Sequence, residues 1–275
     1  MLLRNIFEGG SSYKTLINSE NKLVEVLRNG YSQYFANQSE YRVFRGASAT
    51  GSAIGHITNP KVEGRTSAHT SNEYTLLMSN DPLWSAFPKR SESIICTTST
   101  GGASSYGIVY AVIPPDSFKF GVVPAADLWD GFDTIDRIAG SYGMDTFNRQ
   151  LRNIIFTIYS DEGPSIVKTY QGLRTALESI TYKTIASVNF DSNSNKLYSY
   201  IESKLNSNRN SNAYDIIMQE LLNPSKNGFW TLTSHSEFSK LPTGSSELWT
   251  DSTCVLINLD NIDIEFPELQ KRVLQ

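Results

Sequence analysis

The hydrophobic period of this chain changes twice, and this change most limits the folds open to it. Up to about Ala125, apolar residues alternate with polar ones or form short β-branched runs, both typical of strands. Between 129 and 224 they recur every three to four residues, the helical spacing, and strand-like runs return after Asn223-Pro224. The sequence has no βαβ alternation, internal repeat or coiled-coil heptad. We therefore expect an α+β protein with a large helical insertion.

The same patterns predict individual elements within one domain. Amphipathic helices are expected over 19–36, with Ser19 as N-cap, and the segment 47–65, rich in Gly, Ser, Thr and Asn, is expected to be a loop. Strands are expected at 41–46, 93–96, 108–113, 118–123, 229–233, 247–250, 254–259 and 262–266. Further helices are expected at 71–81, where Pro82 ends the first of them, near Ala103, and at 147–159, 165–180, 197–205 and 214–222. The chain thus divides into N-terminal helices (1–40), a β core (41–128 and 225–268) and a helical insertion (129–224).

Composition and charge exclude several classes of protein. The chain has 275 residues and is 39% hydrophobic, which is enough for a sizeable core. Its net charge of -4 provides no global positive field for nucleic acid or anionic lipid, so a nucleic-acid partner would need a local basic patch. The longest apolar runs, 108–113 and 254–257, are too short to span a bilayer. The first residues carry no export signal, and we expect a soluble, cytoplasmic protein without a membrane partner.

The cysteines and histidines indicate neither a disulfide nor a metal centre. Cys96 and Cys254 both fall in expected strands, and we expect reduced, buried thiols that lie close together if those strands are neighbours. The histidines at 56, 69 and 235 have no metal-ligand spacing with one another or with the cysteines. No metal site is therefore predicted.

Three short motifs carry the chemistry that we expect. Arg45 and Gly46 end a strand, where a planar fork of donors suits a phosphate and a glycine lets a flat ring approach the backbone. The turn Thr97-Thr98-Ser99 follows a second strand and faces a cleft. Glu247 starts a third strand, and its carboxylate can stabilise the positive charge that builds on a sugar as its glycosidic bond breaks. Together these groups suit cleavage of a nucleotide glycosidic bond.

At these residues the chain resembles the mono-ADP-ribosyltransferases of the arginine-serine-glutamate class, especially the compact bacteriophage enzymes. That family has an aromatic-Arg-Gly strand end, a Ser/Thr-Thr-Ser turn followed by an alanine and an aromatic residue, and a glutamate ahead of an apolar strand. The corresponding stretches here are Phe44-Arg45-Gly46, Thr97-Thr98-Ser99 with Ala103 and Tyr106, and Glu247-Leu248-Trp249. The resemblance covers 41–123 and 228–266. It implies a split antiparallel β core with a cleft between its two sheets.

The resemblance also implies roles for these residues in binding and cleaving NAD. Arg45 would bind the NAD phosphates, and the backbone of Gly46 would hold the nicotinamide amide. The hydroxyls of the turn Thr97-Thr98-Ser99 would shape the pocket, with Thr97 and Ser99 orienting the glutamate. Glu247 would hold the ribose 2′-hydroxyl in the transition state, and Tyr106 would form a wall for nicotinamide.

The chain departs from the family pattern at Ser245, two residues before the glutamate. Family members that modify arginine carry glutamate at this position and others carry glutamine, so the acceptor stays open among another side chain, a nucleic acid and water. Ser245 would face this acceptor, and a protein is favoured over nucleic acid. The alternatives to a transferase are an NAD glycohydrolase and a non-catalytic interaction protein that works through the helical insertion.

Each motif alone also has a purely structural interpretation. Arg45 could be a surface charge paired with a carboxylate, and the 97–99 turn could cap the helix that follows. Glu247 could be a solubilising charge on an edge strand. Lys89 and Arg90 are expected to be exposed cations, with Arg90 as a possible second phosphate contact.

Overall fold

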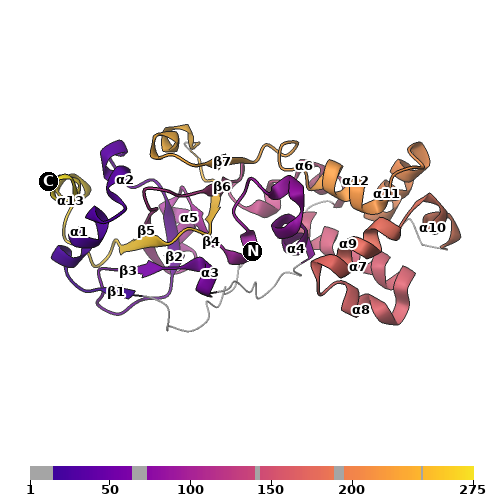
Figure 1. Ribbon diagram of the computed structural model, residues 1–275, viewed down its shortest axis with the longest axis horizontal. Coiled ribbons are helices and arrows are strands. Elements are labelled where there is room, and N and C mark those ends of the chain that lie inside the picture. The colour runs from indigo at the N-terminus through magenta and orange to yellow at the C-terminus, as the bar shows by residue number, and fades with distance from the viewer. Residues whose placement is uncertain (1–14, 64–72, 140–142, 189–194, 243) are drawn as a thin grey trace. The chain divides into compact units, whose positions relative to one another are not determined.

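The computed structural model describes residues 15–63, 73–139, 143–188, 195–242 and 244–275. Contacts divide the chain into two compact units (Figure 1). The β unit comprises 1–68, 87–127 and 230–275, and the helical unit comprises 69–86 and 128–229. The helical unit thus contains the segment 69–86 in addition to the block that the periodicity places at 129–224.

The β unit is built on one antiparallel sheet of nine strands. In spatial order these are β1 (Thr15–Ile17), β3 (Gly55–Thr58), β9 (Cys254–Asn258), β5 (Ile108–Ile113), β2 (Phe44–Ala47), β4 (Ile94–Thr97), β8 (Glu247–Thr250), β6 (Phe120–Val122) and β7 (Trp230–Leu232). Each of these strand pairs is antiparallel. The α+β class predicted from the sequence is therefore confirmed.

The sheet is nearly interrupted in its middle. β2 pairs with β5 along all four of its residues, whereas its pairing with β4 on the other side consists of Phe44 and Thr97 alone. Five strands therefore lie on one side of this single residue pair and four on the other. Beyond the pair, the backbone groups of β2 and β4 need other hydrogen-bond partners.

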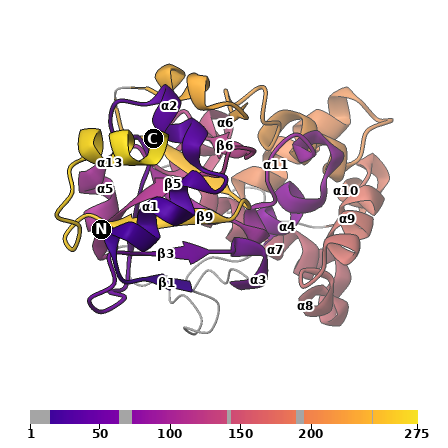
Figure 2. The same cartoon turned by 60° about the vertical axis from the view of Figure 1, so that its left-hand side comes forward.

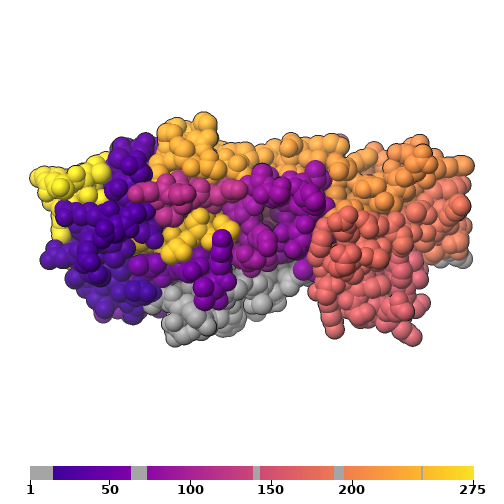
Figure 3. Space-filling model, viewed as in Figure 1, coloured from indigo at the N-terminus to yellow at the C-terminus, as the bar shows by residue number. Residues whose placement is uncertain are grey.

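Three helices of the β unit gather together next to the sheet: α1 (Glu20–Arg28), α2 (Ser32–Asn37) and α13 (Phe266–Leu274) (Figures 1 and 2). α1 begins as predicted, because the Ser19 side chain accepts a hydrogen bond from the backbone N–H of Lys22, and it buries Leu23 and Leu27 at helical spacing. α13 contacts both α1 and α2, and Figure 3 shows α1 and α13 side by side on the surface. Their buried residues and those of the strands form one continuous core.

The helical unit consists of short helices around the long helix α7. Its members are α4 (Glu73–Asn80), α6 (Asp133–Ala139), α7 (Gly143–Tyr159), α8 (Gly163–Ile166), α9 (Tyr170–Ser179), α10 (Tyr182–Ser187), α11 (Lys196–Ser207), and α12 (Ala213–Ile216), which continues into a π-helical turn, Ile217–Leu221. The single helix expected at 165–180 is instead two, and Thr169 caps the second by accepting from the N–H of Gly172.

Buried polar groups explain why the segment 69–86 belongs to the helical unit. The carboxylate of Glu73 is almost fully buried and pairs with Arg152 of α7. Asp81 is also buried and accepts a hydrogen bond from the hydroxyl of Tyr214. The indole of Trp84 donates to the carbonyl of Leu222 at 2.9 Å. These buried carboxylates have partners within the same unit, which offsets the cost of removing them from water.

The segments 47–65 and 262–266 of the β unit were assigned wrongly from the sequence. The segment 47–65 was expected to be a loop, but it contains β3 and the short helix α3 (Pro60–Glu63). β3 has only four residues, and its pairing with β1 on one side and β9 on the other stabilises it. The sequence does not reveal these partners, because β1 has only three residues and β9 lies near the other end of the chain. The segment 262–266 was expected to be a strand, but residues 262–265 have no regular structure and α13 begins at Phe266. Pro267 lies in the first turn of this helix, as is common at helix starts.

Within the described ranges, no helix is both long and apolar enough to cross a bilayer.

Packing in the sheet provides a stability test at Gly121 of β6. Gly121 pairs with Trp249 of β8, and a Cβ at Gly121 would lie 2.3 Å from two atoms of the indole. Gly121→Ala is therefore expected to reduce the unfolding free energy by about 1–3 kcal/mol, as overpacking usually does. Gly244→Ala is the matched control, because its Cβ would have no neighbour within 4 Å. We expect it to change stability by less than about 0.5 kcal/mol in urea unfolding, and equal effects of both substitutions would contradict this packing.

Candidate active site

The three predicted motifs lie on three consecutive strands of the sheet. Phe44, which precedes Arg45 on β2, pairs with Thr97 on β4, and Thr97 in turn pairs with Glu247 on β8. Residues directly opposite each other in an antiparallel sheet have side chains on the same face. Segments some 50 and 150 residues apart in sequence therefore meet in one row across the middle of the sheet.

Arg45 lies where β2 and β4 separate. It is half-buried, and its Nη1 donates to the backbone carbonyl of Ile95 on β4 at 2.6 Å. The side chain thus connects the two strands just past the last residue pair that joins their backbones. A guanidinium has five N–H donors, so it can hold a carbonyl and a phosphate oxygen together.

Gly46 has a packing reason for lacking a side chain. A Cβ at this position would lie 1.9 Å from the carbonyl oxygen of Ala103 and 2.8 Å from the Cβ of Tyr106. The short helix α5 (Thr100–Ser104) therefore packs directly against the backbone of β2. Tyr106, just after this helix, keeps 41% of its surface exposed, which is high for an aromatic residue beside a sheet.

The hydroxyls of the 97–99 turn shape the connection from β4 to α5. Ser99 is the N-cap of α5, because its Oγ accepts from the N–H of Gly102 at 3.1 Å. The Oγ1 of Thr97 accepts from the N–H of Ser99 at 3.1 Å and lies 3.3 Å from the Oγ of Ser245. The helix-cap interpretation of this turn is therefore confirmed for Ser99, and Thr97 is directed towards the segment that precedes Glu247.

Thr98 fastens that segment to the turn. Its Oγ1 donates to the carbonyl of Gly244 at 2.8 Å and accepts from the N–H of Ser246 at 2.9 Å. Its backbone N–H donates to the carbonyl of Ser246 at 3.1 Å. Three hydrogen bonds to one threonine thus fix the residues on either side of Ser245, and with them the start of β8.

Glu247 lies in the interior of the sheet. β8 is flanked by β4 and β6, so the interpretation of Glu247 as an edge-strand charge is wrong. Its side chain is 9% exposed and pairs with Arg90, whose Nη1 lies 2.6 Å from Oε1 of the glutamate. A buried carboxylate needs such a partner, because removing it from water is otherwise very costly.

Arg90 is the residue whose position the sequence failed to predict. It begins the 3₁₀ turn Arg90–Glu92 just before β4, and its side chain is 3% exposed, whereas an exposed cation was expected. Lys89 is exposed as predicted and pairs with Glu92. In the sequence, Arg90 is a single arginine between an aromatic segment and a buried strand. This local pattern does not identify Glu247, more than 150 residues away, as its partner.

Aromatic contacts hold Arg90 in place. Its guanidinium lies over the ring of Trp249, 5.6 Å from the ring centroid. The indole N–H of Trp249 donates to the carbonyl of Pro88 at 2.9 Å, and Phe87 stacks on the same indole with the ring centroids 5.8 Å apart. The segment that carries Arg90 is thereby anchored to β8, the strand that carries Glu247.

The two cysteines are structural. Burial raises the pKa of Cys96 to about 12, with a smaller opposing effect of Arg45 and a small additional rise from Glu247. Burial also raises the pKa of Cys254 well above its ordinary value. Both are free and buried as predicted, but β4 and β9 are separated by β5 and β2 and are not neighbours. The thiols stay protonated at neutral pH, so neither suits a nucleophile.

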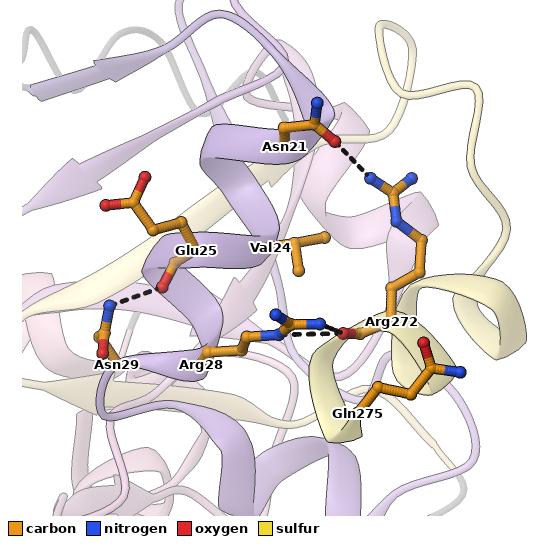
Figure 4. A pocket seen from close by; sticks show the side chains of 7 residues that line it. All are labelled: Asn21, Val24, Glu25, Arg28, Asn29, Arg272 and Gln275. Carbon is orange, nitrogen blue, oxygen red and sulfur yellow. Dashed lines mark hydrogen bonds between the residues drawn. The ribbon is translucent and has the colours of Figure 1, made fainter.

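Other parts of the described chain provide weaker candidates. Among the described residues, no group of three or more His, Cys, Asp or Glu could hold a metal ion. A surface hollow between α1 and α13 is lined by none of the predicted site residues (Figure 4). There Arg28 donates to the carbonyl of Arg272, and Arg272 bonds Glu20 and Asn21. These contacts explain both arginines as ties between the two helices.

No family model, curated protein or solved structure gave a significant match to the chain. Function is therefore inferred from the residues and their geometry.

The threonine that fastens the segment before Glu247 gives a stability test. Thr98→Val keeps the shape of the side chain but removes the hydroxyl. The N–H of the buried Ser246 then loses its acceptor, and the carbonyl of Gly244 loses its donor. We expect a loss of about 1–3 kcal/mol, the usual cost of an unsatisfied buried group. Ser105→Ala, at an exposed hydroxyl nearby, is the control and should cost less than about 0.5 kcal/mol. A Thr98→Val protein as stable as this control in urea would disprove the role of the hydroxyl.

Proposed function

We propose that the β unit binds NAD, cleaves its nicotinamide glycosidic bond and transfers ADP-ribose to a macromolecular acceptor, a protein rather than a nucleic acid. One observation carries this proposal: Phe44, Thr97 and Glu247 form a row across β2, β4 and β8, with Arg45 at the point where β2 and β4 separate. A cation, a set of hydroxyls and a carboxylate from three distant segments are thereby carried by adjacent strands. This combination suits a substrate that joins a pyrophosphate to a sugar.

Arg45 is the proposed ligand of the NAD pyrophosphate. Guanidinium groups bind phosphate oxygens through two parallel N–H donors, which gives direction as well as charge. The bond from Nη1 to the carbonyl of Ile95 fixes the plane of the guanidinium in advance. Less freedom is then lost when the substrate binds.

Glu247 is the proposed catalytic group. In the reaction, the bond between C1′ of the ribose and the pyridinium nitrogen breaks, and its electron pair leaves with nicotinamide. C1′ becomes an oxocarbenium ion, the nucleophile of the acceptor adds to it, and the nucleophile releases its proton to solvent. A carboxylate that holds the ribose 2′-hydroxyl stabilises this cation more than the ground state, which is the requirement for catalysis.

The remaining predicted residues have supporting roles in this proposal. Gly46 and Tyr106 lie close together next to α5. In the proposal, the backbone of Gly46 and the ring of Tyr106 bind the nicotinamide. Ser99 supports the pocket by capping α5, and Thr97 contacts Ser245. Ser245 is exposed, as a residue that faces an acceptor would have to be.

The central test is release of nicotinamide from NAD by the purified chain, measured by chromatography. Glu247→Gln keeps the size of the side chain but removes its charge, so we expect the rate to fall by about 10²–10³-fold, as when one group that stabilises the transition state is removed from an active site. Binding of NAD, measured by calorimetry, should change by no more than a few-fold, because the charge acts mainly on the transition state.

Glu92→Gln is the matched control. Glu92 is an exposed carboxylate in the 3₁₀ turn next to β4, and its replacement should leave the rate unchanged. A folded wild-type chain that neither binds nor cleaves NAD would overturn the proposal. So would a Glu247→Gln variant as active as the wild type.

Radiolabelled NAD in a cell lysate distinguishes transfer from hydrolysis. Label attached to protein supports the transferase, and sensitivity of that label to protease but not nuclease identifies the acceptor class. Free labelled ADP-ribose alone, formed at the rate of nicotinamide release, would identify a glycohydrolase with water as acceptor.

A further inference from the structure

Arg90 and Glu247 form a charged pair in the interior of the β unit, 2.6 Å apart and with side chains 3% and 9% exposed. A buried ion pair often adds little to the stability of the fold, because replacing both partners with apolar residues of similar volume is often neutral or stabilising. The pair therefore needs an explanation other than stability. Its nearness to the row of predicted site residues suggests one.

We infer that Arg90 is a positioning residue, which holds one oxygen of the Glu247 carboxylate so that the other is directed to the sugar of the substrate. This inference rests on the proposed cleavage of NAD. Arg90 contacts Oε1 of the glutamate. In this inference Oε2 accepts the hydrogen bond from the ribose hydroxyl of the bound substrate. A carboxylate fixed in this way loses little freedom when it meets the transition state.

Arg90 can fix the carboxylate because it is fixed itself. Glu247 and Trp249 are two residues apart on β8, so their side chains lie on the same face of the strand. Arg90 pairs with the first and lies over the ring of the second, and so spans both. Its guanidinium is thereby held by two successive side chains on one face.

The indole below Arg90 is in turn held from three directions. Its N–H donates to the carbonyl of Pro88, Phe87 stacks on it, and it covers Gly121, where a Cβ would lie 2.3 Å from the ring. Each of these contacts restrains the plane on which the guanidinium rests. The arrangement is typical of a supporting layer behind a catalytic group, which keeps that group in its productive geometry.

A positioning role and a phosphate-binding role for Arg90 predict different kinetics. A phosphate ligand binds the substrate in the ground state, so its loss would raise KM. A residue that orients Glu247 acts on the transition state, so its loss would reduce kcat and leave KM nearly unchanged. The ion pair with Glu247 favours the second role, because it joins Arg90 directly to the proposed catalytic carboxylate.

The test measures kcat and KM for nicotinamide release in Arg90→Lys, Arg90→Gln and the matched control Lys89→Gln. We expect kcat to fall about 10–100-fold in both Arg90 variants, with KM within about three-fold of the wild-type value, because a lysine keeps the charge but lacks the planar group that lies over Trp249. Lys89 is exposed and contacts Glu92, so Lys89→Gln should match the wild type. If Arg90→Gln does not fold, as judged by circular dichroism, Arg90→Lys alone decides the result.

Three outcomes would overturn the inference, and they can be told apart. A raised KM with unchanged kcat would make Arg90 a substrate ligand. Wild-type kinetics in Arg90→Lys would show that charge alone is sufficient and orientation is not needed. Failure of the wild-type chain itself to release nicotinamide would overturn the proposed function and this inference together. If the wild type is active, a raised KM or wild-type kinetics in Arg90→Lys would overturn only the role of Arg90, and the proposed function would stand.

Discussion

The separation of β2 from β4 after one residue pair is the constraint on which the candidate site depends. A continuous ladder would occupy the backbone groups of both strands, but here the pairing ends at Phe44 and Thr97. Arg45 then bonds the carbonyl of Ile95, and Thr98 bonds the segment before β8. The polar side chains thus satisfy backbone groups at the point where the sheet divides. The strands on either side of this division carry the charged and hydroxyl-bearing side chains of Arg45, Thr97 and Glu247.

Two kinds of residue meet at this place, and their energetic reasons differ. Ser99, Thr98 and Gly46 have local structural reasons, since they cap α5, fasten the segment before β8 and admit α5 against β2. Glu247 and Arg90 have no comparable reason, because burying two charges costs free energy that their attraction only partly returns. The presence of Glu247 therefore most needs a functional explanation. The turn Thr97-Thr98-Ser99 needs one least, because its hydroxyls already have structural roles.

The sequence predicted local structure well and long-range partners poorly. The strand at 108–113 and the strand start at Glu247 agree with the structure, because β-branched runs bounded by turn residues specify strands locally. β3 was missed because its four residues depend on strands from elsewhere in the chain. Arg90 was assigned to the surface because only the fold brings it to Trp249 and Glu247. The candidate residues could be named from motif order, but the burial of Glu247 and the residue that holds it could not.

A crystal structure of the Glu247→Gln chain with NAD would test the candidate site directly, because cleavage is expected to be slow enough for the intact substrate to be seen. We expect the pyrophosphate to lie within hydrogen-bond distance of the guanidinium of Arg45, and the nicotinamide ribose to lie against the side chain of residue 247. Binding of NAD elsewhere on the chain, with Arg45 bonded only to protein atoms, would contradict this expectation. So would a structure without bound NAD at millimolar substrate.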